Sequence, residues 1–225
     1  MPTAPPRIVL ASGSPRRRDL LGRLGVPFAV VASDADESLP PGTAPEAAVI
    51  RLAERKARAV AASGRVPPGA LVLAADTTVA LDGELLGKPA DDAEAEAMLR
   101  RLLGRGHEVW TGVALLDPAT GATRSAAVRS RVVMRRAADA EVAAYLATGE
   151  GRDKAGAYGI QGAAGAFVER VEGCWNNVVG LPLCAVADLL AAAGVPVSPA
   201  GPACTLPDGT ACPRAVSSRV TVSAG

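Results

Sequence analysis

The run Ala70-Leu-Val-Leu-Ala-Ala75 is apolar throughout, and Asp76-Thr77-Thr78 follows it directly. Such a run is typical of a central strand that is buried on both faces of a sheet. Val79-Ala-Leu81 continues in extended form, and Asp82-Gly83 is a hairpin turn signal. A carboxylate at the end of a buried run is well placed to hold a metal ion or accept a proton. The stretch therefore predicts a core strand that carries Asp76 into a site, with loop capping as the alternative role for this residue.

Strand and helix patterns alternate on both sides of this strand. Extended segments are expected over 8–11, 28–32, 84–89, 109–116, 126–134, 166–171 and 178–179, and helices over 14–24, 45–63, 91–103, 139–147 and 183–193. Alternation of this kind predicts an α/β protein with a mixed sheet. The 225 residues suffice for one domain, which we assign to residues 1–195. A disordered tail is expected over 196–225, where the composition shifts to Pro, Ser, Thr, Ala and Gly.

The charge and hydropathy of the chain argue against two classes of partner. With 24 basic and 23 acidic residues the net charge is +1, so no overall field draws the protein to nucleic acid or to an anionic membrane. No apolar run approaches the roughly 20 residues that span a bilayer, and the first residues lack a signal-peptide pattern. We therefore expect a cytoplasmic protein without nucleic-acid or membrane partners.

The cysteine and histidine content restricts the choice of metal. The four cysteines form no Cys-x-x-Cys pair, and His107 is the only histidine. A structural zinc site is therefore disfavoured, and His107 is expected at the surface or at a strand edge. A metal ion would have to be held by carboxylates, which favours magnesium or manganese.

Residues 11–18, Ala-Ser-Gly-Ser-Pro-Arg-Arg-Arg, stand where a strand gives way to a helix. Ser14 is a good N-cap, and Pro15 suits the first helical position. The free N–H groups of a helix start bind anions, and the guanidinium groups of Arg16 and Arg17 match the geometry of phosphate. Three arginines in a first turn oppose the helix dipole unless an anion offsets them. The segment therefore predicts a phosphate site.

Further charged and amide side chains complete a candidate site. Lys56 falls on the apolar stripe of the helix over 45–63, where it needs an anionic partner or ligand unless it reaches the surface. Lys88 returns along the hairpin toward Asp76, with a solvated turn as the alternative. Gln161, in a glycine-rich segment over 154–162, offers a donor and an acceptor to a base edge, unless the segment is simply a flexible loop. Together with the acidic loop over 33–44, these residues suggest a nucleotide site.

Seven stretches stand in a fixed order between about residues 7 and 195. They are Leu10-Ala-Ser-Gly-Ser-Pro-Arg-Arg17, Leu52-Ala-Glu-Arg-Lys-Ala57, Ala75-Asp-Thr77, Leu86-Gly-Lys-Pro89, Thr111-Gly-Val113, Lys154-Ala-Gly-Ala-Tyr-Gly-Ile-Gln-Gly162 and Val178-Val-Gly-Leu-Pro-Leu183. Together they resemble the Maf family of nucleoside triphosphate pyrophosphatases. One stretch would indicate little, but seven in register make the resemblance specific.

The resemblance implies a Maf/ITPase-like fold, in which a twisted mixed sheet with flanking helices forms two lobes around a central cleft. It also implies hydrolysis of a nucleoside triphosphate to the monophosphate and pyrophosphate with Mg²⁺ or Mn²⁺. Asp76 matches the family's catalytic aspartate, usually given as the proton acceptor. Arg16, Thr77 and Gln161 match positions linked to substrate choice, and Ser12, Arg17, Glu37, Lys56 and Lys88 match other cleft positions.

The segment Ala157-Tyr-Gly-Ile-Gln-Gly162 resembles the subgroup that acts on dTTP and UTP. Two features depart from the usual pattern: Cys174-Trp-Asn176, where a Ser-Tyr pair is common, and the long tail. The first bears on base preference. The second is expected to leave catalysis unaffected.

A mechanism follows as a hypothesis. Glu37 and Asp76 would hold the metal ion, and Asp76 or the metal would activate the attacking water. Lys56 and Lys88 would stabilise the departing pyrophosphate, which makes them catalytic together with Asp76. Ser12, Arg16, Arg17, Thr77 and Gln161 would bind the substrate.

Two other interpretations stay open at this point. One is a non-catalytic, nucleotide-binding regulator of septum formation, since the family is associated with arrest of cell division. The other is a pyrophosphatase with a different base preference, such as 7-methyl-GTP. The oligomeric state is also open, with a homodimer as one option.

Overall fold

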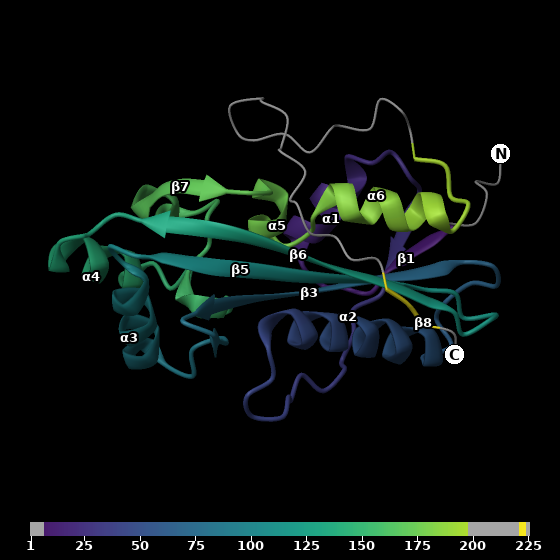
Figure 1. Cartoon of the computed structure of the whole chain (residues 1–225), viewed down its shortest axis with the longest axis horizontal. Coiled ribbons are helices and arrows are strands. Elements are labelled where there is room, and N and C mark those ends of the chain that lie inside the picture. The colour runs from purple at the N-terminus through teal and green to yellow at the C-terminus, as the bar shows by residue number, and fades with distance from the viewer. Residues whose placement is uncertain (1–6, 198–220, 224–225) are drawn as a thin grey trace.

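The strand β3 (Leu71–Leu81) runs through the middle of a mixed sheet in the computed structural model, which describes residues 7–197 and 221–223 (Figure 1). The strand order is β2-β1-β3-β5-β6-β7, with β4 paired to β3 and β8 paired to β6. The other strands are β1 (Ile8–Leu10), β2 (Phe28–Val30), β4 (Glu84–Leu86), β5 (Gly106–Leu116), β6 (Thr123–Met134), β7 (Val168–Glu172) and β8 (Thr221–Ser223). β1 is parallel to β2 and to β3, and the remaining pairs are antiparallel. The predicted α/β class with a mixed sheet is confirmed.

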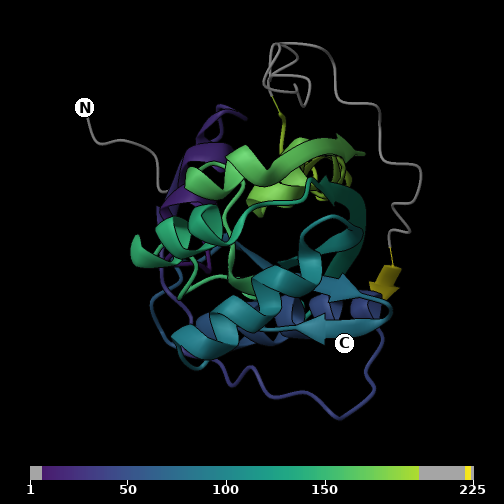
Figure 2. The same cartoon turned by 90° about the vertical axis from the view of Figure 1, so that its left-hand side faces the viewer.

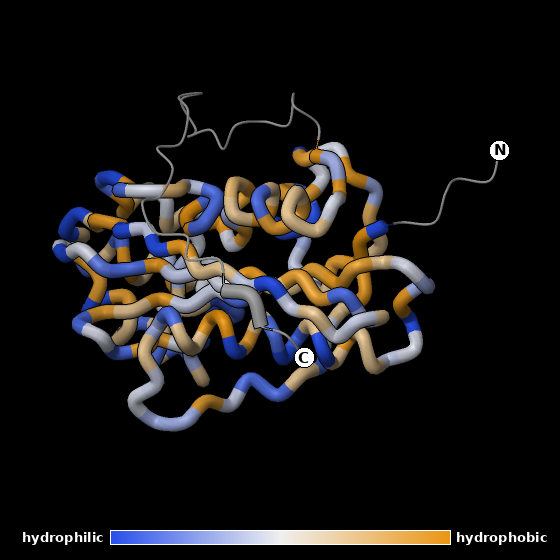
Figure 3. The backbone as a smooth tube through the Cα atoms, turned by 45° about the vertical axis from the view of Figure 1, so that its right-hand side comes forward, coloured by the Kyte–Doolittle hydropathy of each residue, from blue (hydrophilic) through white to orange (hydrophobic). Residues whose placement is uncertain are grey.

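Helices cover both faces of this sheet. On one face α2 (Pro45–Ala62) packs against β3, β5 and β6, and on the other lie α1 (Pro15–Gly22), α5 (Trp175–Val179) and α6 (Leu183–Ala192) (Figure 1). α3 (Asp92–Leu102) and α4 (Asp139–Ala147) pack together at one end, near the 3-10 turns Ala155–Ala157 and Ala163–Phe167. The turned view separates the two helical layers (Figure 2). Hydrophobic segments are concentrated in the strands and in the helices that cover them (Figure 3).

Successive side chains of β3 point alternately to the two faces of the sheet, so this one strand contributes to the core on both sides. Val72 and Ala74 pack in a core cluster with Ala53, Ala57 and Val60 of α2. Leu73 packs in the other cluster, with α1 and α6. Because successive side chains of a strand point to opposite faces, Asp76 continues the first set and Thr77 the second. The two residues therefore meet different partners although they are neighbours in the sequence.

Two sequence predictions concern the C-terminal third of the chain. The segment at 178–179, predicted to be extended, is wrong, because Val178 and Val179 form the last turn of α5. Local capping overrides their β-branched character: the Sγ atom of Cys174 accepts a hydrogen bond from Asn177 N at the helix start, and Gly180 ends the helix with φ of 123°. For the predicted disordered tail, residues 198–220 and 224–225 lie outside the described residues, whereas 221–223 pair with β6 as β8.

Gly112 of β5 sets how closely α2 approaches the sheet. A Cβ atom at this position would lie 2.3 Å from the carbonyl oxygen of Val49, in the backbone of α2. Since Gly112 is the cross-strand partner of Asp76, a displaced α2 would also disturb the site. We expect Gly112→Ala to lower the free energy of unfolding by about 1–3 kcal/mol, because overpacking strains the contact. Urea unfolding of this variant checks the prediction, with Gly121→Ala, in an exposed turn, as a comparison that should report only the strain of its φ of 75°.

Candidate active site

A cavity of about 870 Å³ opens beside β3, where one edge of that strand lacks a paired neighbour in the described chain. β1 pairs with β3 as far as Leu73, and β4 begins to pair at Val79, which leaves residues 74–78 between them. Of these, residues 76–78 line the cavity. The turn that joins β3 to β4, Asp82-Gly83, has φ values of 54° and 83°, as a type I′ hairpin requires. Ligands of α/β proteins bind at the carboxyl ends of parallel strands, and the end of β1 opens into this cavity.

The nine residues singled out from the sequence all line this one cavity. They are Ser12, Arg16, Arg17, Glu37, Lys56, Asp76, Thr77, Lys88 and Gln161. They come from the loop after β1, the start of α1, the loop before α2, α2 itself, β3, the segment after β4 and the loop after α4. Their juxtaposition is an observation, whereas the role of each stays a prediction.

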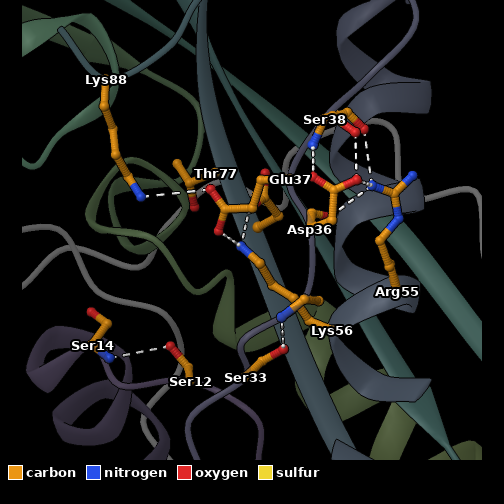
Figure 4. Close-up of polar contacts among 12 residues, drawn as sticks. Ser12, Ser14, Ser33, Asp36, Glu37, Ser38, Arg55, Lys56, Thr77 and Lys88 are labelled. Atoms are coloured by element: carbon orange, nitrogen blue, oxygen red, sulfur yellow. Dashed lines mark hydrogen bonds and ion pairs between the residues drawn. The ribbon is translucent and has the colours of Figure 1, made fainter. Parts of the chain in front are cut away.

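A lysine stands between the two carboxylates that were predicted to hold a metal ion. The Nζ atom of Lys56 lies 2.6 Å from Asp76 Oδ1 and 2.6 Å from Glu37 Oε1. Lys88 approaches Glu37 from another side, with its Nζ atom 3.6 Å from Oε2 (Figure 4). The side chains of Lys56 and Asp76 are only 12% and 10% exposed. The inward-facing lysine of the α2 stripe thus has the anionic partners that its position requires.

The charge state of Glu37 follows from these neighbours. Burial alone would raise the pKa of the Glu37 carboxyl, but the hydrogen bond and charge of Lys56, with a contribution from Lys88, leave that pKa below its ordinary value. Glu37 is therefore ionised at neutral pH, as a cation ligand has to be.

Arg55 does not line the cavity, but it holds the loop that carries Glu37, a role that the sequence reasoning missed. Its Nη1 atom donates to the backbone oxygens of Asp36 and Ser38, at 2.6 and 2.9 Å, and lies 3.5 Å from the Asp36 carboxylate (Figure 4). These contacts bracket Glu37 on both sides along the chain. Because α2 supplies both Arg55 and Lys56, the helix positions the loop as well as the cation that faces it. Arg55 stands next to Lys56 in the stretch Leu52–Ala57, but charge on a half-exposed helix position is too common to indicate such a role.

The start of α1 forms the second part of the site. Ser14 caps the helix by accepting a hydrogen bond from Arg17 N, Pro15 stands at the first position, and no acidic residue lies in the first turn. The hydroxyl oxygen of Ser12 accepts hydrogen bonds from Ser14 N at 3.3 Å and from Arg17 Nη1 at 3.4 Å. The helix start and its arginines thus present donors to the cavity, which suits an anionic group.

Arg17 ties this helix to two other elements. Its Nε atom donates to Gly180 O at 2.9 Å, and its Nη2 atom donates to Thr77 Oγ1 at 3.0 Å. Burial lowers the pKa of Arg17 from its ordinary value, although the nearby Asp76 opposes that shift, and a guanidinium stays charged in proteins nonetheless. Neither Arg16 nor Arg17 forms an ion pair with another residue of the described chain. Their charge is therefore available to a ligand.

The loop after α4 closes the cavity on the side that carries Gln161. Gly156 N donates to Gly87 O at 3.0 Å, which joins this loop to the segment that holds Lys88. The side chain of Tyr158 anchors the loop in the core, with its hydroxyl 2.8 Å from His107 Nε2. Gln161 itself is exposed at the mouth of the cavity. An exposed amide on an anchored loop can reach the edge of a bound base.

The expectation that His107 lies at the surface or at a strand edge is wrong. The residue is 2% exposed, near the start of β5, a strand paired on both sides, and its ring packs edge-to-face against Tyr158. Burial lowers the pKa of His107 to about 4. The contact with Tyr158, 51 residues away in the sequence, decided the outcome.

This burial predicts a pH-dependent stability. Because the unfolded chain binds the proton at an ordinary histidine pKa of about 6.5 and the folded chain only near 4, protonation favours unfolding between those values. The stabilisation is complete above about pH 6.5 and falls as the pH drops toward 4. We expect His107 to account for a loss of about 2 kcal/mol between pH 7 and pH 5. Urea titrations of the wild type and of His107→Gln at both pH values check this, since the variant should lose that much less.

The donors at the site fit a hard divalent cation only in part. Asp76 and Glu37 supply carboxylate oxygens, which such ions prefer. Across residues 7–197, however, no group of three or more His, Cys, Asp and Glu side chains is arranged to hold a metal. Mg²⁺ usually binds through one or two carboxylates, water and the phosphate oxygens of a ligand. Glu37 and Asp76 therefore fit an ion that arrives with a phosphorylated ligand.

The fold and the site together define an α/β protein with a cleft suited to a polyanionic ligand. Cations and a helix start face carboxylates across one edge of the central strand. Comparison with known proteins agrees. The family model described as Maf-like protein matches residues 7–193. Proteins named dTTP/UTP pyrophosphatase are similar to the chain over most of its length. That of Anaeromyxobacter dehalogenans is 52% identical over 85% of this chain and 96% of its own length.

Two further relatives with this name give the same result. The protein of Deinococcus radiodurans is 52% identical, over 84% of this chain and 94% of its own length. The protein of Myxococcus xanthus is 54% identical over the same shares. The chain belongs to the Maf-like protein family.

Proposed function

We propose that this protein is a nucleoside triphosphate pyrophosphatase that hydrolyses dTTP and UTP to the monophosphate and pyrophosphate. The proposal is supported by relatives of that name with identities of 52–54% over most of the chain. The observation that carries it is the cluster of Lys56, Asp76 and Glu37 beside the arginines of α1 in one cavity. Such a cavity can bind a triphosphate and place a carboxylate next to it.

Each group of cavity residues has a separate role in the proposed reaction. Arg16, Arg17 and the start of α1 bind phosphate oxygens and neutralise their charge. Asp76 accepts a proton from the water that attacks the α-phosphorus, and the bond to the β-phosphate oxygen breaks. Lys56 and Lys88 stabilise the pyrophosphate that leaves. Gln161 contacts the base at the mouth of the cavity.

A divalent metal ion is part of the proposal. When bound, it supplies positive charge to the phosphate oxygens, and Glu37 and Asp76 would hold it. Lys56 contacts one oxygen of each carboxylate, which leaves the second oxygen of each for the ion. Release of either contact would free the Lys56 ammonium to contact phosphate.

Pyrophosphate release from a panel of nucleoside triphosphates tests the function. Purified protein is expected to act on dTTP and UTP with Mg²⁺ and to lose that activity when the metal is chelated. A preference for a purine nucleotide would contradict the base preference alone. Activity that survives chelation would contradict the proposed metal requirement alone. Binding of nucleotide without release of pyrophosphate would contradict catalysis and favour a regulatory role.

No helix in the part of the chain that the structure describes is both long and apolar enough to cross a membrane.

A further inference from the structure

A chain of hydrogen bonds runs from the cavity into the core through Thr111, a residue that does not line the cavity. Arg17 Nη2 donates to Thr77 Oγ1 at 3.0 Å, Thr77 Oγ1 lies 2.9 Å from Thr111 Oγ1, and Thr111 Oγ1 lies 2.9 Å from the backbone oxygen of Asn177. Thr77 and Thr111 are cross-strand partners on β3 and β5. Thr111 and Asn177 are fully buried, so water does not intervene.

The hydrogen atoms in this chain have only one consistent arrangement. Two oxygen atoms 2.9 Å apart repel each other unless a hydrogen lies between them. A carbonyl oxygen carries none, so the hydrogen between Thr111 and Asn177 must come from the Thr111 hydroxyl, which has only one. The hydrogen between the two threonines must therefore come from Thr77. The Thr77 hydroxyl is thus committed as a donor to Thr111 and as an acceptor from Arg17.

What remains for a ligand is one lone pair of Thr77 Oγ1. A hydroxyl oxygen has two lone pairs, and Arg17 occupies one of them. Thr77 is half-buried and lines the cavity, and the contacts of its hydroxyl among the described residues leave this second lone pair unused. A phosphate oxygen, itself an acceptor, gains nothing from this contact, although the neighbouring Arg17 does bind anions. The group that Thr77 accepts must be an N–H or an O–H.

We propose that Thr111 is a positioning residue that orients the Thr77 hydroxyl as an acceptor for a donor group of the nucleoside. This rests on the proposed function, which supplies the nucleotide. dTTP and UTP carry such donors at base N3 and in the sugar hydroxyls. CTP lacks the N3 hydrogen and presents an acceptor there. An acceptor-only threonine would therefore favour uracil and thymine over cytosine, or would recognise the sugar.

Three pairs of nucleotides separate these sources in the wild-type protein. UTP against CTP reports on the N3 hydrogen, UTP against dUTP on the 2′-hydroxyl, and dTTP against its 3′-deoxy analogue on the 3′-hydroxyl. One of the pairs is expected to show about a fivefold to tenfold higher kcat/KM for the member with the donor, as one neutral hydrogen bond provides. Absence of discrimination in all three pairs would overturn the proposal.

The variants test the role of Thr111. Thr111→Val removes the acceptor that holds the Thr77 hydrogen, so the hydroxyl is free to rotate and donate, and the discriminating ratio should fall close to one. Thr111→Ser keeps the hydroxyl and should keep the ratio. Thr123→Val makes the same change at a buried threonine of β6 outside the cavity and should leave the ratio unchanged. If Thr111→Val does not fold, Thr77→Val should abolish the same ratio by removing the acceptor itself.

The outcomes separate this inference from the proposed function. Pyrophosphate release by the wild type, with a ratio that falls in Thr111→Val and persists in Thr111→Ser, supports both. If Thr111→Val lowers kcat/KM equally for every nucleotide and leaves the ratios intact, Thr111 is merely structural and the inference is wrong while the function stands. If the wild type releases no pyrophosphate, both are overturned.

Discussion

Replacing Asp76 with asparagine is expected to lower kcat for pyrophosphate release from UTP about a hundredfold to ten-thousandfold. Asparagine has nearly the same size, but its amide cannot accept a proton from water at neutral pH. It also removes the charge that lies 2.6 Å from Lys56 Nζ. The strand should persist, because its apolar neighbours on β3 are unchanged. Steady-state kinetics with UTP, together with a thermal melt that confirms folding, measure this effect.

Asp82→Asn is the matched control for this variant. Asp82 follows β3 in the exposed turn to β4, where its carboxylate pairs with Arg105, and asparagine tolerates its positive φ. We expect wild-type turnover from this control. Turnover near that of the wild type in Asp76→Asn would refute the assigned role. A titration with Mg²⁺ adds a distinction, since partial rescue at high metal concentration indicates that Asp76 binds the ion.

Replacing Lys56 with methionine is expected to lower kcat/KM about a hundredfold to a thousandfold. Methionine preserves the apolar stem along the α2 stripe but removes the ammonium between Asp76 and Glu37. The two carboxylates then face the cavity without this cation, and a triphosphate meets their negative charge. Lys56→Arg keeps the charge but replaces a compact ammonium with a planar fork, so it should restore activity only in part.

Arg58→Met provides the control for the loss of a cation from α2. Arg58 lies on the exposed face of the same helix, where it pairs with Glu54 outside the cavity. It should retain wild-type kcat/KM, because exposed pairs of this kind contribute little. If Lys56→Met behaved like Arg58→Met, the proposed contact of Lys56 with the substrate would be contradicted.

Local patterns in the sequence were sufficient to predict much of this structure. The helix over 45–63 and the hairpin at Asp82-Gly83 were predicted from capping, periodicity and turn residues, and the structure places α2 at Pro45–Ala62 and the β3–β4 turn at those two residues. Failures occurred where a distant contact outweighed a local pattern. His107 was predicted at the surface but packs against Tyr158, and Val178-Val179 was predicted to be extended but ends a capped helix.

The candidate site, too, was predictable from the sequence only in part. The types of residue that suit phosphate, a cation and a base were recognisable from the sequence. The sequence did not reveal that Lys56 would stand between Glu37 and Asp76. Nor did it reveal that Arg55 would hold the loop on both sides of Glu37, or that Thr111 would face Thr77. Each of these depends on which elements become neighbours.

The amino-acid sequence by itself determined the elements of this protein and the chemistry that they carry, because helix caps, turns and alternating side chains act between residues a few positions apart. Only the tertiary structure decided which groups pair across the cavity. Arg17 and Gly180 are 163 residues apart in the chain and are joined by a hydrogen bond of 2.9 Å. Strand register and helix packing make such contacts. They place Asp76 beside Lys56 and its sequence neighbour Thr77 beside Arg17.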